Sequence, residues 1–336
     1  MDVKFKWQEA TSAPLGYPVD VLRGGLEAAD GDFTGLIRGT TVGAWGQANQ
    51  GMSDGMKTIP FRLHVIWLSY AEDCFYEVDT SLDYFKIAAL FKKGYYVPSI
   101  DPDRPGPFKE DYNQINVGFA PGGYVTVWVG GVSRQIKVGT ATGKKVVIPQ
   151  EVISGLDYPL KNLFDEKYKK ETMLNDRIVP KEVQEYNKGK KIPFGKWEKF
   201  NRRYNWNVEI KLPGNEAVSS TDFSFMNGEH EQLFGASLEK KYQIDNDFCL
   251  NTPKERAVPE ILAFYYNDST GQEHAISVFF NETETLDAFC EVFDKGHASD
   301  ATIVVDVNQL RTGASVSMVT PDKKTIWLTD CKVKGR

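Results

Sequence analysis

The sequence predicts an α+β fold with mostly antiparallel sheets, a few helices and two sheet-containing lobes. Three observations lead to this prediction. Apolar residues alternate with a period of two in many short runs, which is typical of strands. Several of these runs follow one another closely with turn residues between them, as in antiparallel meanders. Helical periodicity is confined to a few segments that separate groups of strands.

The N-terminal part is predicted to form strands joined by glycine-rich loops. Residues 18–22 and 34–38 are expected strands. Residues 44–58 are expected to be a long loop, because they follow neither a helical nor a strand period. Residues 62–69 form the clearest strand, with apolar side chains on both faces, as in the centre of a sheet. Residues 74–78 continue this strand or pair with it.

A helix is predicted over residues 82–93, with Thr80 or Ser81 as its N-terminal cap and Gly94 as its stop. Proline and glycine make residues 98–107 a loop. Two hairpins are expected to follow, and their four strands suggest an antiparallel meander. These strands are residues 116–119, 124–129, 134–138 and 144–148.

Helical patterns occupy much of residues 149–206, with expected helices at 180–187 and 194–204. The final third returns to strands. They are predicted at residues 208–212, 257–266, 275–280, 301–307, 314–319 and 325–328. One helix, residues 282–295, interrupts them; Asn281 caps it and Glu284 is placed as in a capping box. We therefore expect an N-terminal α+β domain over 1–206 and a C-terminal α+β domain over 207–336.

Composition excludes several classes of protein. No run approaches eighteen consecutive apolar residues, so no membrane span is expected. The net charge of −6 argues against nucleic-acid binding. The four cysteines lack C-x-x-C spacing and are expected to be buried free thiols, although a Cys290–Cys331 bridge stays open. The first residues lack a signal pattern, so the chain is expected to be cytoplasmic as written, or periplasmic or envelope-associated if a leader has been removed.

No catalytic, cofactor-binding or metal-binding residues are predicted. The sequence lacks the G-x-S-x-G, G-x-G-x-x-G and G-x-x-x-x-G-K-[ST] motifs, and its four histidines lack metal-ligand spacing. The glycine-rich segment 51–55 is interpreted as a flexible loop. Glu72 and Asp73 lie between apolar strands, where buried carboxylates must pair with a cation or titrate near neutral pH. A structural ion pair is the favoured interpretation of these two residues.

The segment between Glu166 and Arg203 is basic. It contains twelve Lys and Arg residues but only six Asp and Glu residues. Aromatic residues are interleaved with these charges. Helical spacing places most of the aromatic side chains on the inner face, so a solvated helix surface is the favoured interpretation. The same surface is also a candidate for contact with an acidic partner.

Several short motifs resemble the bacterial domain-of-unknown-function family 2931, whose members are often lipoprotein-like. The resemblance covers about two thirds of the chain. Its matching pieces are Tyr17-Pro18-Val19 with Gly24-Gly25, Trp45-Gly46, Trp67-Leu68-Ser69-Tyr70-Ala71-Glu72-Asp73, Phe91-Lys92-Lys93-Gly94-Tyr95, residues 117–123, Phe194-Gly195-Lys196-Trp197 and Arg203-Tyr204-Asn205-Trp206. The resemblance brings no established activity and no catalytic residues. It implies an envelope association, and for some members a place beside type VI phospholipase effectors; the lipid-accepting cysteine of the lipoprotein pattern is missing from the start of this sequence.

The leading hypothesis is therefore a non-enzymatic binding protein, with an immunity protein that occludes an antibacterial effector as its specific form. Its expected partner is another protein, with no nucleic acid and no cofactor. The predicted interaction residues are Lys196, Lys199, Arg202, Arg203, Trp45, Asp101, Asp103 and Arg104. One alternative is a carbohydrate-binding or hydrolytic protein that uses Glu72 and Asp73 in an aromatic cleft near Trp45, Trp67 and Trp128. Another is an envelope-associated structural protein.

Overall fold

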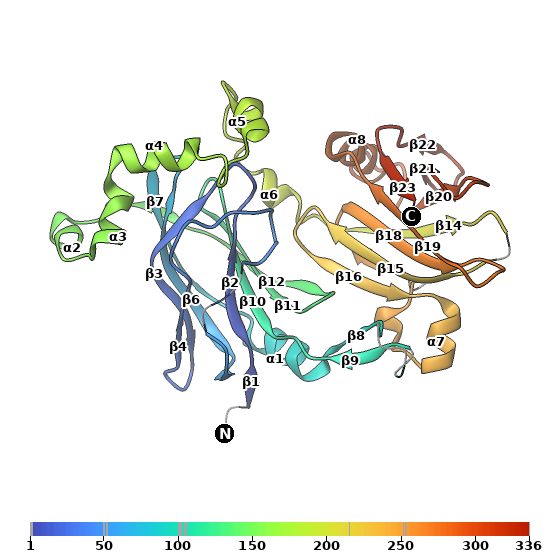
Figure 1. Cartoon of the computed structure of the whole chain (residues 1–336), viewed down its shortest axis with the longest axis horizontal. Helices are drawn as coiled ribbons and strands as arrows, with labels where there is room; N and C mark the ends of the chain where they lie inside the picture. Colours follow the sequence, from blue (N-terminus) through green and yellow to red (C-terminus); the bar gives the residue numbers. More distant parts are fainter. Residues whose placement is uncertain are drawn as a thin grey trace. The chain divides into compact units, whose positions relative to one another are not determined.

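The computed structural model describes residues 3–49, 51, 53–99, 103, 106–214, 216–250, 252 and 254–335 (Figure 1). It has 20% helix and 41% strand in mostly antiparallel sheets, which confirms the predicted α+β class. The chain forms two compact units. The first comprises residues 1–94, 111–131 and 135–199, and the second comprises residues 95–110, 132–134 and 200–336. The predicted domain boundary near residue 206 stays a prediction.

The first unit contains a five-stranded antiparallel sheet with strand β6 at its centre. Val65 and Trp67 on one face of β6 and Ile66 and Leu68 on the other are buried, which explains why this strand is apolar on both faces. In sheet order the strands are β13 (Lys144–Val146), β7 (Cys74–Ser81), β6 (Pro60–Ser69), β3 (Val19–Ala28) and β4 (Phe33–Gly35). The prediction that residues 74–78 pair with the preceding strand is confirmed.

A second group of strands in the first unit contains the predicted hairpin. Its members are β2 (Gln8–Ser12), β10 (Gln114–Ala120), β11 (Tyr124–Gly130) and β12 (Gln135–Thr142), with β2 parallel to β10 and the other neighbours antiparallel. The predicted second hairpin is wrong, because β13 pairs with β7 rather than with β12. At the junction, Gly143 lies against Trp67 so closely that a Cβ atom would be 2.6 Å from the ring. The chain therefore leaves one sheet and enters the other at this glycine.

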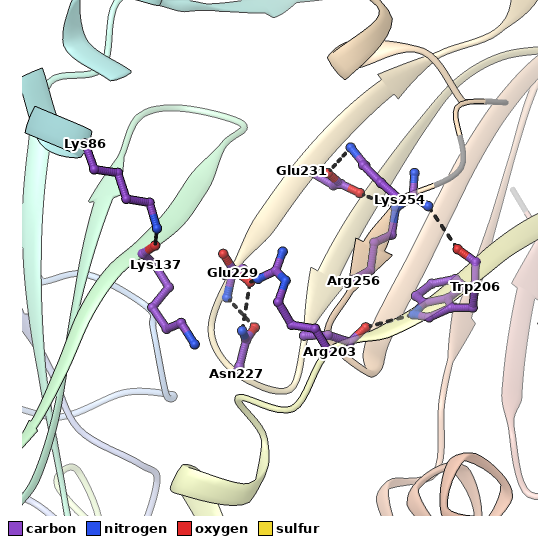
Figure 2. Close-up of polar contacts among 10 residues, drawn as sticks. Lys86, Lys137, Arg203, Trp206, Asn227, Glu229, Glu231, Lys254 and Arg256 are labelled. Carbon is purple, nitrogen blue, oxygen red and sulfur yellow. Dashed lines mark hydrogen bonds and ion pairs between the residues drawn. The ribbon is translucent and has the colours of Figure 1, made fainter. Parts of the chain in front are cut away.

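Helix α1 (Tyr84–Lys93) begins later than predicted. Its cap is Asp83, whose side chain accepts a hydrogen bond from the Lys86 amide, because residues 80 and 81 still belong to β7. Gly94 ends the helix as predicted. The Lys86 side chain also donates to the carbonyl oxygen of Lys137 on β12, at 2.8 Å (Figure 2).

The segment predicted as a loop over 44–58 ends in a short strand. This strand, β5 (Met56–Thr58), pairs with β1 (Lys4–Lys6). After β13 come the short helices α2 (Gln150–Ser154), α3 (Tyr158–Lys161), α4 (Glu166–Leu174), α5 (Lys181–Asn187) and α6 (Lys196–Lys199), with a 3₁₀ turn at Asn162–Phe164. Leu160 and Leu163 pack on Ile66 and Leu68, so these helices cover the central sheet. The helix predicted over 194–204 is shorter, because the chain becomes extended from Tyr204.

The second unit contains two groups of five neighbouring strands. One has, in sheet order, β16 (His230–Phe234), β15 (Val218–Phe225), β18 (Pro259–Asn267), β19 (Glu273–Phe279) and β23 (Lys332–Gly335). The other has β17 (Glu255–Arg256), β14 (Tyr204–Lys211), β20 (Ala301–Val307), β21 (Ala314–Val319) and β22 (Thr325–Trp327). The indole of Trp206 on β14 lies 6.0 Å from the ring of Phe223 on β15, so the aromatic core joins the two sheets.

Helix α8 (Glu282–Phe289) completes this core, since the ring of Phe289 lies 6.0 Å from Trp206. Asn281 caps the helix as predicted. The carboxylate of Glu284 accepts instead from the amides of Thr329 and Asp330, so the predicted capping box is only half formed. The remaining elements are β8 (Tyr95–Val97), β9 (Phe108–Glu110), α7 (Ala236–Tyr242), a 3₁₀ turn at Asn246–Phe248 and a π turn at Cys290–Asp294.

A buried carboxylate, Asp20, lies near the start of β3 in the first unit. It accepts hydrogen bonds from the Gly39 amide at 3.1 Å and from the hydroxyls of Tyr70 and Thr40 at 3.4 and 3.5 Å. Burial raises the pKa of Asp20 to about 6, against the weaker effect of these donors. Asp20 directly follows the Tyr17-Pro18-Val19 motif, whose last residue is the first residue of β3.

Asp20→Asn should raise the melting temperature above pH 6 and leave it nearly unchanged at pH 4. The pKa of Asp20 in the folded state exceeds its ordinary value of 3.8, so the folded state binds more protons between these limits. Stability therefore falls as the pH rises from about 4 to about 6. Thermal unfolding of wild type and variant at pH 4, 5, 6 and 7.5 measures this effect. Parallel profiles for the two proteins would show that Asp20 is not the responsible group.

Candidate functional site

Two arginines of the predicted basic stretch form ion pairs within the second unit. Arg202 forms a two-pronged ion pair with Asp294, and Arg203 pairs with the buried carboxylate of Glu229. Lys196 and Lys199 lie on α6, where the Lys199 side chain is exposed. Arg202 and Arg203 therefore already have carboxylate partners.

Of the other predicted interaction residues, the structure describes Trp45 in the first unit and Asp103 in the second. Trp45 packs edge-on against Trp128, with ring centroids 5.0 Å apart, and contacts Trp197 at 6.4 Å. The carbonyl oxygen of Gly46 next to it accepts from the Asn116 side chain at 2.9 Å. Asp103 is exposed. The predicted residues Asp101 and Arg104 lie outside the described residues.

Glu72 and Asp73 lie in the turn between β6 and β7. Glu72 accepts hydrogen bonds from Ser69 at 2.9 Å, Tyr76 at 2.7 Å and the Gly122 amide at 3.1 Å. Asp73 has a φ of 49° and pairs with Lys169 on α4. The ion pair between Asp73 and Lys169 agrees with the structural role favoured for this residue in the sequence analysis.

The tryptophans proposed as walls of an aromatic cleft are mostly core residues. Trp67 and Trp128 are 0% exposed. The ring of Trp67 lies 4.8 Å from Phe119, centroid to centroid. Neither side chain is therefore open to a sugar in this conformation.

A charged cluster that the sequence did not reveal lies in the second unit (Figure 2). Its centre is Glu231 on β16, whose two carboxylate oxygens accept from Lys254 and from Arg256, each at 2.7 Å. Arg256 on β17 also donates to the carbonyl oxygen of Trp206 at 3.1 Å. The Trp206 indole donates in turn to the carbonyl oxygen of Ala257, at 3.1 Å. Together with Arg134, described next, Glu231, Lys254 and Arg256 form what we call the Glu231 cluster.

Arg134 adds a third positive charge to this cluster. Its guanidinium lies 4.6 Å from the centroid of the Phe248 ring and acts electrostatically on both Glu231 and Lys254. The residue is 8% exposed, and its Nε and Nη1 atoms are buried without a hydrogen-bond partner. A buried guanidinium with two unused donors is costly, because it has lost its water without gaining replacement hydrogen bonds.

The titration behaviour shows an excess of positive charge. Burial alone would raise the pKa of Glu231, but Lys254, Arg256 and Arg134 together hold it at about 2. Burial lowers the pKa of Lys254, and Arg256 and Arg134 lower it further against the opposing effect of Glu231. Within the described part of the chain, the strongest charges here thus come from three cations and one carboxylate.

Strand pairing explains how distant residues reach this cluster. Arg256 lies opposite Tyr204 where β17 pairs with β14, which places its side chain beside Trp206. Glu231 lies opposite Phe223 where β16 pairs with β15. The positions of Arg256 and Glu231 therefore depend on strand pairing between distant parts of the chain, and the spacing of these residues in the sequence does not predict it.

Comparison with known proteins places the chain in a family. A family described as a protein of unknown function, DUF2931, matches residues 2–195. The chain belongs to this family. The match includes Arg134 but ends before Glu231, Lys254 and Arg256, so most of the cluster lies beyond the DUF2931 region. No curated protein and no solved structure matches the chain.

The described residues contain no group of three or more His, Cys, Asp and Glu residues that could hold a metal ion. Over the same residues, no helix is both long and apolar enough to cross a membrane. The four cysteines are free, as expected, but Cys290 is exposed and only Cys249 is fully buried.

Proposed function

We propose that this DUF2931 protein is a binding protein that recognises an anionic group, a phosphate or a carboxylate, through the Glu231 cluster. The observation that carries the proposal is Arg134, a buried guanidinium with two unused donors beside two further cations and one carboxylate. A bound anion would supply the missing hydrogen bonds and balance the charge.

The chemistry of arginine favours this role. The guanidinium is planar, permanently charged and more weakly hydrated than an ammonium group, so it suits carboxylate and phosphate recognition. The Phe248 ring holds the guanidinium of Arg134 in place, and Glu231 fixes Lys254 and Arg256. The cluster is thus organised before any ligand arrives, which reduces the entropic cost of binding.

We further propose that another protein carries the anionic group and that the chain acts on it by occlusion through the Glu231 cluster. The more specific role of an immunity protein against an antibacterial effector rests on the family resemblance alone. Co-purification with the product of the neighbouring gene tests it. A complex that is lost when Arg134 is replaced would support both the partner and the site.

Arg134→Met should abolish a phosphate-specific stabilisation that the wild type shows. Methionine keeps much of the apolar packing on Phe248 but removes the charge. Inorganic phosphate should raise the wild-type melting temperature at constant ionic strength. At a hundredfold excess over the dissociation constant, the free energy of unfolding should rise by about 2.7 kcal/mol. Without phosphate, Arg134→Met should be at least as stable as wild type, because it lacks an uncompensated buried cation.

Lys167→Met is the matched control, because Lys167 is an exposed cation on α4 in the first unit. This variant should keep the phosphate response of the wild type. Thermal unfolding in phosphate and chloride buffers, followed by titration calorimetry, provides the measurement. Equal responses of wild type and Arg134→Met to phosphate would refute the proposed site.

A further inference from the structure

A pocket of about 570 Å³ in the first unit contains a serine, a lysine and a glutamate in mutual contact. The lysine lies in β5, the serine in the segment that leads into it, and the glutamate in β2. The apolar part of the lining comes from β4 and the residues that follow it. Six of the lining residues are Glu9, Ser53, Lys57, Phe33, Leu36 and Ile37. Its components all lie within the DUF2931 match.

The hydroxyl of Ser53 connects the two charged side chains. Its Oγ accepts a hydrogen bond from the Lys57 Nζ at 2.8 Å and donates to the Glu9 Oε2. The Lys57 Nζ and Glu9 Oε2 atoms are 3.5 Å apart. The Lys57 Nζ also lies over the Trp7 ring, 4.0 Å from its centroid.

The backbone holds Ser53 against these partners. The Ser53 amide donates to the Glu9 Oε1 at 3.3 Å, so both oxygens of this buried carboxylate contact the same residue. Gly51 allows the close approach, because a Cβ atom there would lie 1.9 Å from the carbonyl oxygen of Glu9. The glycine-rich segment interpreted as a flexible loop is therefore fastened to β2 at its serine.

The surroundings of Lys57 favour its neutral form more than water would. Burial lowers the pKa of Lys57, although Glu9 and Asp54 oppose the change. The Lys57 Nζ and the Ser53 Oγ are 2.8 Å apart, so a neutral Lys57 amine is close enough to take the serine proton once the hydroxyl turns from Glu9 toward it. Serine and lysine pairs of this kind are one of the recurring solutions to nucleophile activation.

We propose that Ser53 is a nucleophile that reacts with apolar acyl esters, with Lys57 as its general base. The Ser53 oxygen forms a bond to the acyl carbon while its proton moves to the neutral Lys57 amine. The bond from the acyl carbon to the alcohol oxygen then breaks, and Lys57 returns the proton to that oxygen. Water hydrolyses the resulting acyl-serine. The apolar lining of Phe33, Leu36 and Ile37 suits the acyl group.

Glu9 is a positioning residue in this scheme. It accepts a hydrogen bond from the Ser53 hydroxyl, and its negative charge partly offsets the lowering of the Lys57 pKa by burial. The site is independent of the proposed function, because its residues belong to the first unit and the Glu231 cluster belongs to the second. Failure of either proposal leaves the other in place.

A fluorophosphonate probe on the full-length protein tests the proposal, since the Ser53 oxygen would displace fluoride from phosphorus. Intact-mass and peptide mass spectrometry should find one adduct on Ser53, with a labelling rate that rises between pH 7 and pH 9.5. Ser53→Ala should abolish the adduct. Lys57→Arg should reduce the labelling rate at least about 100-fold, because the guanidinium keeps the ion pair but does not act as a base.

Glu9→Gln separates a reactive site from a purely structural one. Removing the negative charge lowers the pKa of Lys57 further, so labelling at pH 7 should become faster than in wild type. Melting temperatures of all variants verify that each is folded. An unlabelled wild-type Ser53 across this pH range, or equal labelling of wild type and Lys57→Arg, would overturn the proposal.

Discussion

Glu231→Gln should lower the free energy of unfolding by about 3–5 kcal/mol, the range typical of breaking a buried ion pair from one side. The variant keeps the shape of the side chain but leaves Arg134, Lys254 and Arg256 without their shared carboxylate. Arg256 is 3% exposed, so its charge cannot turn to water without a rearrangement of β17. The loss reflects uncompensated cations more than the strength of the original bonds.

The pH dependence of this loss identifies its origin. The pKa of Glu231 is about 2 in the folded protein, below its ordinary value of 4.5. Its contribution to stability is therefore complete above pH 4.5 and is lost as the pH falls through 2. Chemical denaturation of wild type and variant between pH 3 and pH 7 should show the difference shrinking toward acid.

The control for this experiment is Glu171→Gln, which removes an exposed carboxylate paired with Lys167 on α4. Exposed pairs of this kind contribute little, so the variant should be indistinguishable from wild type. A Glu231→Gln protein that is equally stable would mean that the three cations find other partners, and the charge imbalance behind the proposed function would be absent.

Strands with clear apolar alternation could be predicted from the sequence. Residues 301–307 and 314–319 match β20 and β21 at both ends. In β20, buried positions alternate with more exposed ones, whereas β21 has three consecutive buried residues at its centre. Both strands are apolar runs bounded by turn residues, so local pattern and tertiary environment agree. The central position of β6 was also predictable, because a strand that is apolar on both faces is typical of the centre of a sheet.

Strands made of small polar residues could not be predicted in this way. In β2, Glu9, Thr11 and Ser12 are almost fully buried although the local sequence is polar. The strand exists because it pairs in parallel with β10, more than one hundred residues later in the chain. β15 is similar, since Ser220 and Thr221 are buried between strands. Such positions depend on long-range contacts that leave no periodic signal.

The two candidate sites were hidden for the same reason. Lys57 follows Ser53 by four residues, but Glu9 joins them only because the 51–55 segment lies against β2. Arg134 precedes its cluster partners by about one hundred residues. A search for motifs examines spacing along the chain, whereas these side chains meet through sheet pairing. The predicted basic stretch was conspicuous in sequence, yet Arg202 and Arg203 form ion pairs inside their own unit.

Gly24→Ala should destabilise the protein by roughly 2–5 kcal/mol, by adding backbone strain of about 1–2 kcal/mol to a steric conflict of about 1–3 kcal/mol. Gly24 has a φ of +113°, which an L side chain rarely adopts. A Cβ atom there would lie 2.2 Å from the carbonyl oxygen of His64 on the neighbouring strand β6. Neither strand can withdraw easily, because β3 and β6 form the centre of the five-stranded sheet.

Two other glycines separate strain from steric conflict. Gly31 has a φ of +89° with open space around its Cβ position, so Gly31→Ala should cost only about 1 kcal/mol. Gly139 has open space and no positive φ, so Gly139→Ala should be neutral or slightly stabilising. Urea denaturation of the three variants should rank them in this order. If Gly24→Ala were no worse than Gly31→Ala, β3 would have room to move away from β6, and the Gly24-Gly25 motif would need an explanation other than close strand packing.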